Sequence, residues 1–164
     1  MATRRRAMRR RIADIRSKAA QNGHSVKIGV NAFVIARDTE EEARAVLDEI
    51  IEKANPEAVH GFAHEVKNAG KASPEGEGNW AKSSFEDLVQ YNDGFKTNLI
   101  GTPRQIAERI VHLKSIGVDL VLTAFLHFQE EVEYFGKHVP TARPRTGKGN
   151  QAAGGLNHSS IQKN

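Results

Sequence analysis

Apolar positions along the chain follow two different patterns. Residues 8–22 carry apolar side chains three and four positions apart, which predicts a helix that ends near Gly23. Residues 26–37 and 118–126 are instead almost continuously apolar and rich in Val, Ile, Leu and Phe, which is typical of strands buried on both faces. Because strands that alternate with helices form parallel sheets, the pattern predicts an α/β fold.

Three further helices are predicted from their start signals or their apolar spacing. Thr39 and Glu42 form a capping box, in which each side chain bonds the backbone of the other residue. Thr102 and Gln105 form a second box, with a proline at the first helical position. A last helix is predicted over residues 128–138.

The middle of the chain has a weaker pattern. Residues 55–69 are predicted to continue as helix after an Asn-Pro pair, and residues 70–84 to form a loop because they are rich in glycine, serine and charge. Residues 84–95 predict a short helix followed by a turn at Asn92-Asp93-Gly94. Residues 99–101 are a brief apolar stretch.

Charge is divided unevenly along the chain. The formal net charge of +4 combines about +7 in residues 1–18, −8 in residues 19–136 and +5 in residues 137–164. A folded surface that binds nucleic acid needs its basic residues on the body of the domain, and here the body is acidic. Residues 140–164 have no apolar periodicity and are expected to be a disordered tail.

Several classes of protein are disfavoured by simple counts. The chain has no cysteine, so it has neither a disulfide framework nor a thiolate nucleophile. We find no signal-peptide pattern and no apolar run of ~18 residues, so a soluble cytoplasmic protein is expected. His60 and His64 lie four positions apart without an evident third ligand, and no metal site is expected.

Three stretches of the sequence resemble a known family. The first, NLIGTPRQIAERIVHLKSIGVDLVLTAFLHFQEEVEYFGKHV, resembles the end of bacterial-luciferase-like flavin-dependent monooxygenases. The second, KIGVNAFVIARDTEEEARAVLDEII, resembles the seventh strand of that family and the start of its insertion. The third, KASPEGEGNWAKSSFEDLVQYNDGFKTNLIGTP, is similar to the branch that oxidises dimethyl sulfone.

The resemblance implies a fold and a domain organisation. The expected fold is the C-terminal portion of a luciferase-like (β/α)8 TIM barrel, incomplete and with a long insertion, because two main strands are too few for a stable sheet and a whole barrel takes ~250 residues. The expected parts are a basic arm (residues 1–11), the barrel portion (12–139, with the insertion at about 55–98) and the tail (140–164). Both ends differ from the family, which suggests the hypothesis of a truncated or frameshifted reading frame.

The resemblance also implies chemistry. The family uses reduced FMN, supplied by a separate NAD(P)H-dependent FMN reductase, together with O2, and its full-length members are expected to form homo-oligomers. For this branch the implied reaction converts dimethyl sulfone into methanesulfinate and formaldehyde. Two alternatives remain: an inactive remnant or partner subunit of such an enzyme, and, from the arginine-rich arm, a nucleic-acid-binding module.

Four strand residues carry over as catalytic candidates. The alkanesulfonate branch has an arginine and a histidine two residues apart on the seventh strand, and these positions are Asn31 and Phe33 here. The loss of both potential cations suits a neutral sulfone, although Phe33 is equally well read as core packing. A tyrosine of the last strand aligns with Phe125, and His127 follows two positions later, either as a site residue or packed beside a glutamate at the start of the last helix.

Four residues of the insertion are candidates for binding the cofactor. Trp80 and Ser83 lie in the predicted lid, where Trp80 either covers the site or anchors the loop on the surface. Asn92 aligns with an arginine of the alkanesulfonate branch, and its neighbour Tyr91 is a possible replacement. The alternative for Asn92 is an ordinary turn residue.

Overall fold

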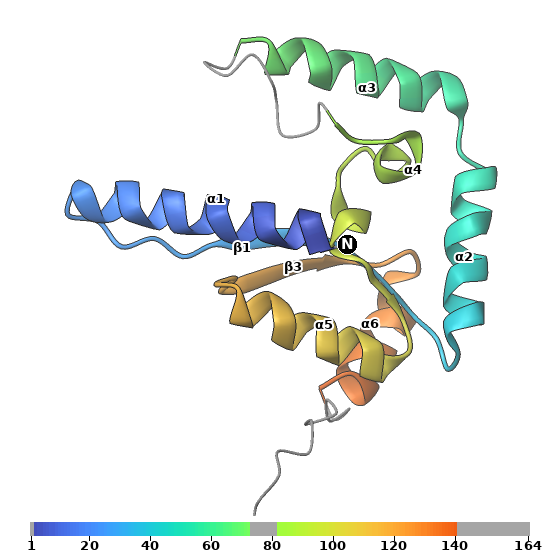
Figure 1. Cartoon of the computed structure of the whole chain (residues 1–164). Coiled ribbons are helices and arrows are strands. Elements are labelled where there is room, and N and C mark those ends of the chain that lie inside the picture. The colour runs from blue at the N-terminus through green and yellow to red at the C-terminus, as the bar shows by residue number, and fades with distance from the viewer. Residues whose placement is uncertain (1, 73–81, 141–164) are drawn as a thin grey trace, which may run out of the picture.

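The structure of the chain is a computed structural model that describes residues 2–72 and 82–140, with side chains of the first helix described from residue 6. Its elements follow in the order α1 (Ala2–Gln21), β1 (Gly29–Ala36), α2 (Glu40–Glu52), α3 (Pro56–Gly70), α4 (Phe85–Leu88), the 3-10 helix η1 (Gly94–Thr97), β2 (Leu99–Gly101), α5 (Pro103–Ser115), β3 (Leu120–Ala124) and α6 (Phe128–His138). Figure 1 shows the chain leaving β1 through α2 and α3 and returning to the sheet through α4.

The sheet has three parallel strands in the order β2-β1-β3. The central strand β1 pairs with β3 over its first five residues, from Gly29↔Leu120 to Phe33↔Ala124, and with β2 over its last three, which begin with Val34↔Leu99. The sequence indicated two main strands, and the short stretch 99–101 supplies the third. It was hard to recognise as a strand because three residues are too few to show a period.

Two apolar cores lie on the two faces of β1. The first core gathers the even-numbered positions of β1 together with α1, β2, α5 and the end of α6, and its buried members are Ile12, Ala32, Val34, Ala36, Leu99, Ile106, Ala107, Leu113, Ile116, Val118 and Val139. The second core gathers the odd-numbered positions with the elements between β1 and β2, and its buried members are Phe33, Ile35, Ala43, Val59, Leu88, Val89, Phe95 and Ile100. Alternate side chains of a strand point to opposite faces, so β1 is covered on both faces from Ala32 to Ala36.

Capping side chains fix where the helices begin. Thr39 Oγ1 accepts the backbone N–H of Glu42 and the Glu42 carboxylate accepts that of Thr39, both at 3.1 Å. The box at Thr102 and Gln105 is also present, at 2.9 and 3.3 Å. Both predicted boxes are confirmed, and α3 proves to be a separate helix with its own N-cap at Asn55.

Two element bounds differ from the sequence pattern. The helix predicted over 8–22 begins at Ala2, because Ala and Arg have high helix propensity and no breaker precedes Gly23. Residues 2–11 of the predicted arm (1–11) and the residues after them therefore share one continuous helix. Strand β3 is shorter than 118–126, since the N–H of Val118 bonds Leu113 O and closes the end of α5.

Helix α1 is held to the start of the sheet by a polar contact. Arg16 Nη2 donates to Gly117 O at 2.9 Å and to Asp119 Oδ2 at 2.8 Å. The same carboxylate oxygen accepts the N–H of Ile28 at 2.8 Å. The hydrogen bond from Ile28 and the neighbouring Arg16 hold the pKa of Asp119 below its ordinary value.

Candidate functional site

One ion pair joins the carboxyl ends of all three strands. The N–H of Arg37, directly after β1, donates to Gly101 O of β2 at 3.2 Å. Its Nη2 donates to Glu131 Oε1 of α6 at 2.7 Å. Glu131 Oε2 in turn accepts the N–H groups of Leu126 and His127, which follow β3, at 2.9 and 3.3 Å. Proteins with parallel α/β sheets place their binding sites at the carboxyl ends of the strands. This ion pair therefore lies in the region where a binding site is expected.

The sequence did not single out Arg37 or Glu131 as a pair. The sequence does place both residues at strand and helix ends: Arg37 directly follows a buried strand, and Glu131 lies in the first turn of the last helix. The glutamate is buried, and a buried carboxylate needs a partner of opposite charge. Only the fold shows that the two residues, 94 positions apart in the sequence, meet.

Asn31 and Phe33 lie on the same face of β1 but in different surroundings. Asn31 is exposed and pairs in register with Leu122. Phe33 is buried in the second core, where its ring packs edge-to-face on Phe95 at 5.0 Å between centroids. The packing role that the sequence allowed for Phe33 is thus present in the structure.

The segment before η1 approaches β1 closely. A Cβ built on Gly94 would come within 2.9 Å of the backbone nitrogen of Phe33. Asn92 holds the turn: its Oδ1 accepts the N–H of Gly94 at 2.7 Å and its Nδ2 donates to Gln90 O at 3.0 Å. Both polar atoms of Asn92 are used within the turn, as the alternative interpretation of this residue predicted.

The other insertion candidates lie next to this turn. Tyr91 has a left-handed backbone (φ 53°), is 49% exposed, and packs edge-to-face on Phe62 at 5.6 Å. Ser83 Oγ accepts a hydrogen bond from Lys96 Nζ at 2.5 Å, and Lys96 lies 4.0 Å from Asp93 Oδ2. Trp80 lies outside the described residues.

Phe125 and His127 are placed differently from Asn31 and Phe33. Because Phe33 pairs with Ala124, the next residue, Phe125, points to the opposite face of the sheet, where it packs against the first core. Its ring lies 5.7 Å from Phe135. His127 is exposed at the N-cap of α6 and makes no side-chain capping bond.

The structure therefore brings some of the predicted site residues together and leaves the others apart. Phe33, Tyr91, Asn92 and Ser83 gather around η1 on the side of the second core, through the contacts described above. Phe125 belongs to the other face, and His127 follows the end of β3. Asn31 lies on the face of Phe33 but is open to solvent.

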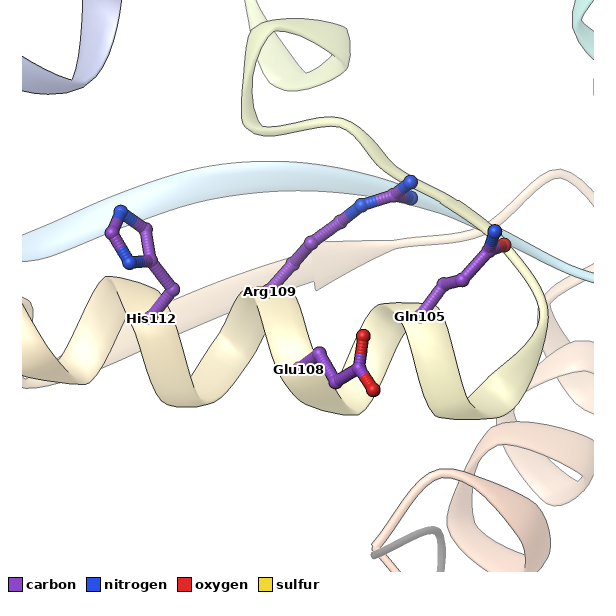
Figure 2. A pocket seen from close by; sticks show the side chains of 4 residues that line it. All are labelled: Gln105, Glu108, Arg109 and His112. Carbon is purple, nitrogen blue, oxygen red and sulfur yellow. The ribbon is translucent and has the colours of Figure 1, made fainter. Parts of the chain in front are cut away.

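A shallow hollow of about 360 Å³ lies along α5 and is lined by Gln105, Glu108, Arg109 and His112, whose side chains Figure 2 shows along one length of the helix. Gln105 donates to Glu40 at 2.6 Å, and Arg109 donates to the backbone oxygen of Asn98 at 2.9 Å. The bond from Gln105, with Arg44 and Arg109 nearby, lowers the pKa of Glu40. These hydrogen bonds tie α5 to α2 and to the start of β2. The apolar side of α5 packs in the first core, on the face of the sheet opposite to Phe33.

Two kinds of feature are absent from the part of the chain that the structure describes. Residues 2–72 and 82–140 contain no group of three or more His, Cys, Asp or Glu side chains arranged to hold a metal ion. Over the same residues, none of the helices combines the length and the apolar character that crossing a membrane requires.

Comparison with known proteins gives a consistent picture. A family model described as "Luciferase-like monooxygenase" matches residues 1–120. An FMNH(2)-dependent dimethylsulfone monooxygenase of Pseudomonas putida is 85% identical over 128 residues, which are 78% of this chain and 35% of that protein. A protein of the same name from Pseudomonas fluorescens (strain Pf0-1) is 73% identical over 142 residues, 86% of this chain and 39% of that protein.

More distant similarities agree on the fold. A sulfoquinovose monooxygenase of Novosphingobium aromaticivorans is 26% identical over 143 residues. The crystal structure of a riboflavin lyase with modified FMN and riboflavin superposes with a TM-score of 0.61 at 20% identity, over 83% of this chain and 35% of that one. The chain thus spans between a third and two fifths of the length of the relatives it matches.

Proposed function

Because the chain belongs to the luciferase-like monooxygenase family, we propose that it serves the reduced-FMN-dependent oxidation of a small neutral organosulfur compound, dimethyl sulfone, to methanesulfinate and formaldehyde. The observation that carries this proposal is the 85% identity to a dimethylsulfone monooxygenase over 128 residues. The family and the α/β, luciferase-like fold predicted from the sequence are confirmed.

The open face of β1 and β3 is chemically suited to the flavin ring. Leu120 and Leu122 are 63% and 65% exposed there, and the amide of Asn31 lies beside them in register. A flat apolar surface with one amide matches a flat heterocycle that has both apolar faces and polar edges. When bound, the flavin supplies the reaction with O2, and the protein supplies position and exclusion of water.

Asn31 and Phe33 support the choice of a neutral substrate. A sulfone has no net charge, and its oxygens accept hydrogen bonds, so an amide N–H binds it without leaving a charge unpaired in the site. An arginine here would be costly to cover with a neutral ligand. Phe33, which is buried on the same face against Phe95, supports the strand next to this position.

The remaining roles are proposed on the same family basis. Tyr91, Asn92 and Ser83 form the side of the site next to η1, with Trp80 in the preceding segment. His127 is proposed to reach the site from the segment after β3, while Phe125, on the opposite face, supports that strand through its packing on the first core. The proposed partners are O2, an NAD(P)H-dependent FMN reductase that delivers the reduced cofactor, and further copies of the enzyme; the segment 55–98 is the proposed insertion.

The proposal is tested by titrating the purified chain with reduced FMN under anaerobic conditions and following flavin fluorescence. We expect saturable binding that Asn31→Ala weakens roughly tenfold, the effect of losing one hydrogen bond to the flavin. Asn68→Ala is the matched control, because Asn68 is an exposed asparagine of α3 that bonds only within its helix region. Absence of saturable binding, or equal loss in both variants, would contradict the proposal. Turnover of dimethyl sulfone is the next measurement.

A further inference from the structure

Glu131 is a buried carboxylate to which the proposed reaction gives no role. Its side chain is 11% exposed, and its two oxygens have different partners. Oε1 accepts a hydrogen bond from Arg37 Nη2 at 2.7 Å, while Oε2 accepts the backbone N–H groups of Leu126 at 2.9 Å and of His127 at 3.3 Å. A carboxylate is costly to bury without such partners, and a satisfied buried network holds its members rigidly in place.

The residue that this network holds most closely is His127, the N-cap of α6. The side chains that usually cap a helix there are those of serine, threonine, asparagine and aspartate, and the His127 imidazole makes no capping bond. The backbone of His127 is nevertheless fixed on both sides, since its N–H donates to Glu131 Oε2 and its C=O accepts the N–H of Glu131 at 3.0 Å. The backbone is therefore held while the exposed imidazole takes no part in capping the helix.

Helix α6 has further attachments to the rest of the chain. Tyr134 donates a hydrogen bond to Asp38 Oδ1 at 2.5 Å, Phe135 packs against the first core, and Val139 is buried within it. These contacts lie further along the helix than Glu131 and dock its body. The particular contribution of Glu131 is therefore to the turn between β3 and α6.

We propose that Glu131, braced by Arg37, is a positioning residue for His127: it fixes the turn after β3 so that the imidazole is presented at the carboxyl ends of the strands. The inference rests on the proposed function, in which His127 reaches the flavin and substrate site from this turn. Arg37 directly follows β1, and its N–H bonds Gly101 O of β2. The carboxylate is thus fixed relative to those two strands, and it places His127 relative to all three.

The alternative is a purely structural role. A carboxylate near a helix N-terminus stabilises the helix through the helix dipole, whatever the neighbouring side chain does. The two roles differ in how the effects of substitutions combine. If Glu131 acts through His127, its loss has no effect on flavin binding once the imidazole is gone, whereas independent effects add.

The test is a double-substitution cycle on the purified chain, with anaerobic titration of reduced FMN as the readout. We expect His127→Ala and Glu131→Ala each to weaken binding roughly tenfold, and the double variant to bind no more weakly than His127→Ala alone. Glu131→Gln keeps an oxygen for the two backbone N–H groups and should restore most of the affinity. Glu130→Ala, at an exposed glutamate of the same helical turn, is the matched control and should leave binding unchanged.

A second measurement needs no flavin. In NMR spectra of the flavin-free chain, Glu131→Ala should shift the imidazole signals of His127 and speed the exchange of the Leu126 and His127 amide protons roughly tenfold, and Glu130→Ala should do neither. Circular dichroism checks folding. If Glu131→Ala does not fold, Glu131→Asp takes its place, because it keeps the charge but is one methylene too short to reach both partners.

Each outcome bears on one proposal or the other. Additive losses of flavin affinity in the cycle, or imidazole signals and amide exchange that Glu131→Ala leaves unchanged, would overturn the positioning role. A failure of the unaltered chain to bind reduced FMN would count against the proposed function, and the NMR comparison would still decide whether Glu131 positions His127.

Discussion

Gly94 marks the closest approach between η1 and the central strand. A Cβ at this position would lie 2.9 Å from the backbone nitrogen of Phe33 and 2.9 Å from Asn92 Oδ1. Since backbone cannot move aside as a flexible side chain can, we expect Gly94→Ala to lower the free energy of unfolding by roughly 1–3 kcal/mol. Thermal and urea denaturation measure this.

Gly61 provides the control for that change. It lies inside α3, and a Cβ there would meet nothing within 4 Å. Alanine is the better helix former, so Gly61→Ala should raise stability by about 0.5–1 kcal/mol. Equal effects of the two substitutions would show that the close approach at Gly94 is unimportant.

Tyr134 gives the molecule a measurable response to alkali. Its burial, and the 2.5 Å hydrogen bond that it donates to Asp38, raise the pKa of the phenol from 10.0 to about 12. A raised pKa means that the folded state favours the neutral phenol. The resulting stability is present below pH 10 and is lost as the pH rises through about 12. Tyr134→Phe should therefore flatten the decline of unfolding free energy between pH 10 and 12, with absorbance of the phenolate as the direct measurement; an unchanged curve would contradict this.

At the scale of single elements, α5 depends on its first residues. Thr102 Oγ1 accepts the N–H of Gln105, and the Gln105 side chain accepts the N–H of Thr102. Thr102→Ala removes one half of this box and should cost about 1 kcal/mol, measured by denaturant unfolding. Thr102→Ser keeps the hydroxyl and should retain most of the stability; a similar loss with serine would point to the methyl group instead.

The helices could be predicted from sequence because their signals are local. Thr39 and Glu42, or Thr102 and Gln105, lie three positions apart and act within one turn. Strand partners are not local. The register that pairs Phe33 with Ala124 joins residues 91 positions apart, and it alone decides that Phe125 faces the first core.

The same difference limits what could be foreseen at the site. Family resemblance aligned residues along the chain, but it did not show which side chains share a face. The alternative interpretation of Asn92 as a turn residue could be drawn from the sequence, because Asn-Asp-Gly is a local turn signal. The pair Arg37 and Glu131, which ties the strand ends together, was not foreseen, since neither residue has a local pattern that names its partner.

At the scale of the whole molecule, β1 is covered on both faces over its second half, from Ala32 to Ala36, while β3 is covered on one. The first core contains residues from both ends of the described chain, from Ile12 in α1 to Val139 after α6. The second core is formed by β1, β2 and the elements between them. The two cores draw on different parts of the sequence, but both include residues of β1. The stability of each core therefore depends on β1 being paired in the sheet.

The position of β1 in the middle of the sheet also has a consequence for biosynthesis. Its residues are translated before those of both neighbouring strands, since Val34 pairs with Leu99 and Gly29 with Leu120, which are 65 and 91 positions later. At ribosomal speeds of ~5–20 residues per second, the nascent strand waits roughly 5–20 s for its last partner. Through that interval a nearly continuously apolar segment of the growing chain lacks its strand partners, a state in which exposed apolar surface is prone to aggregate.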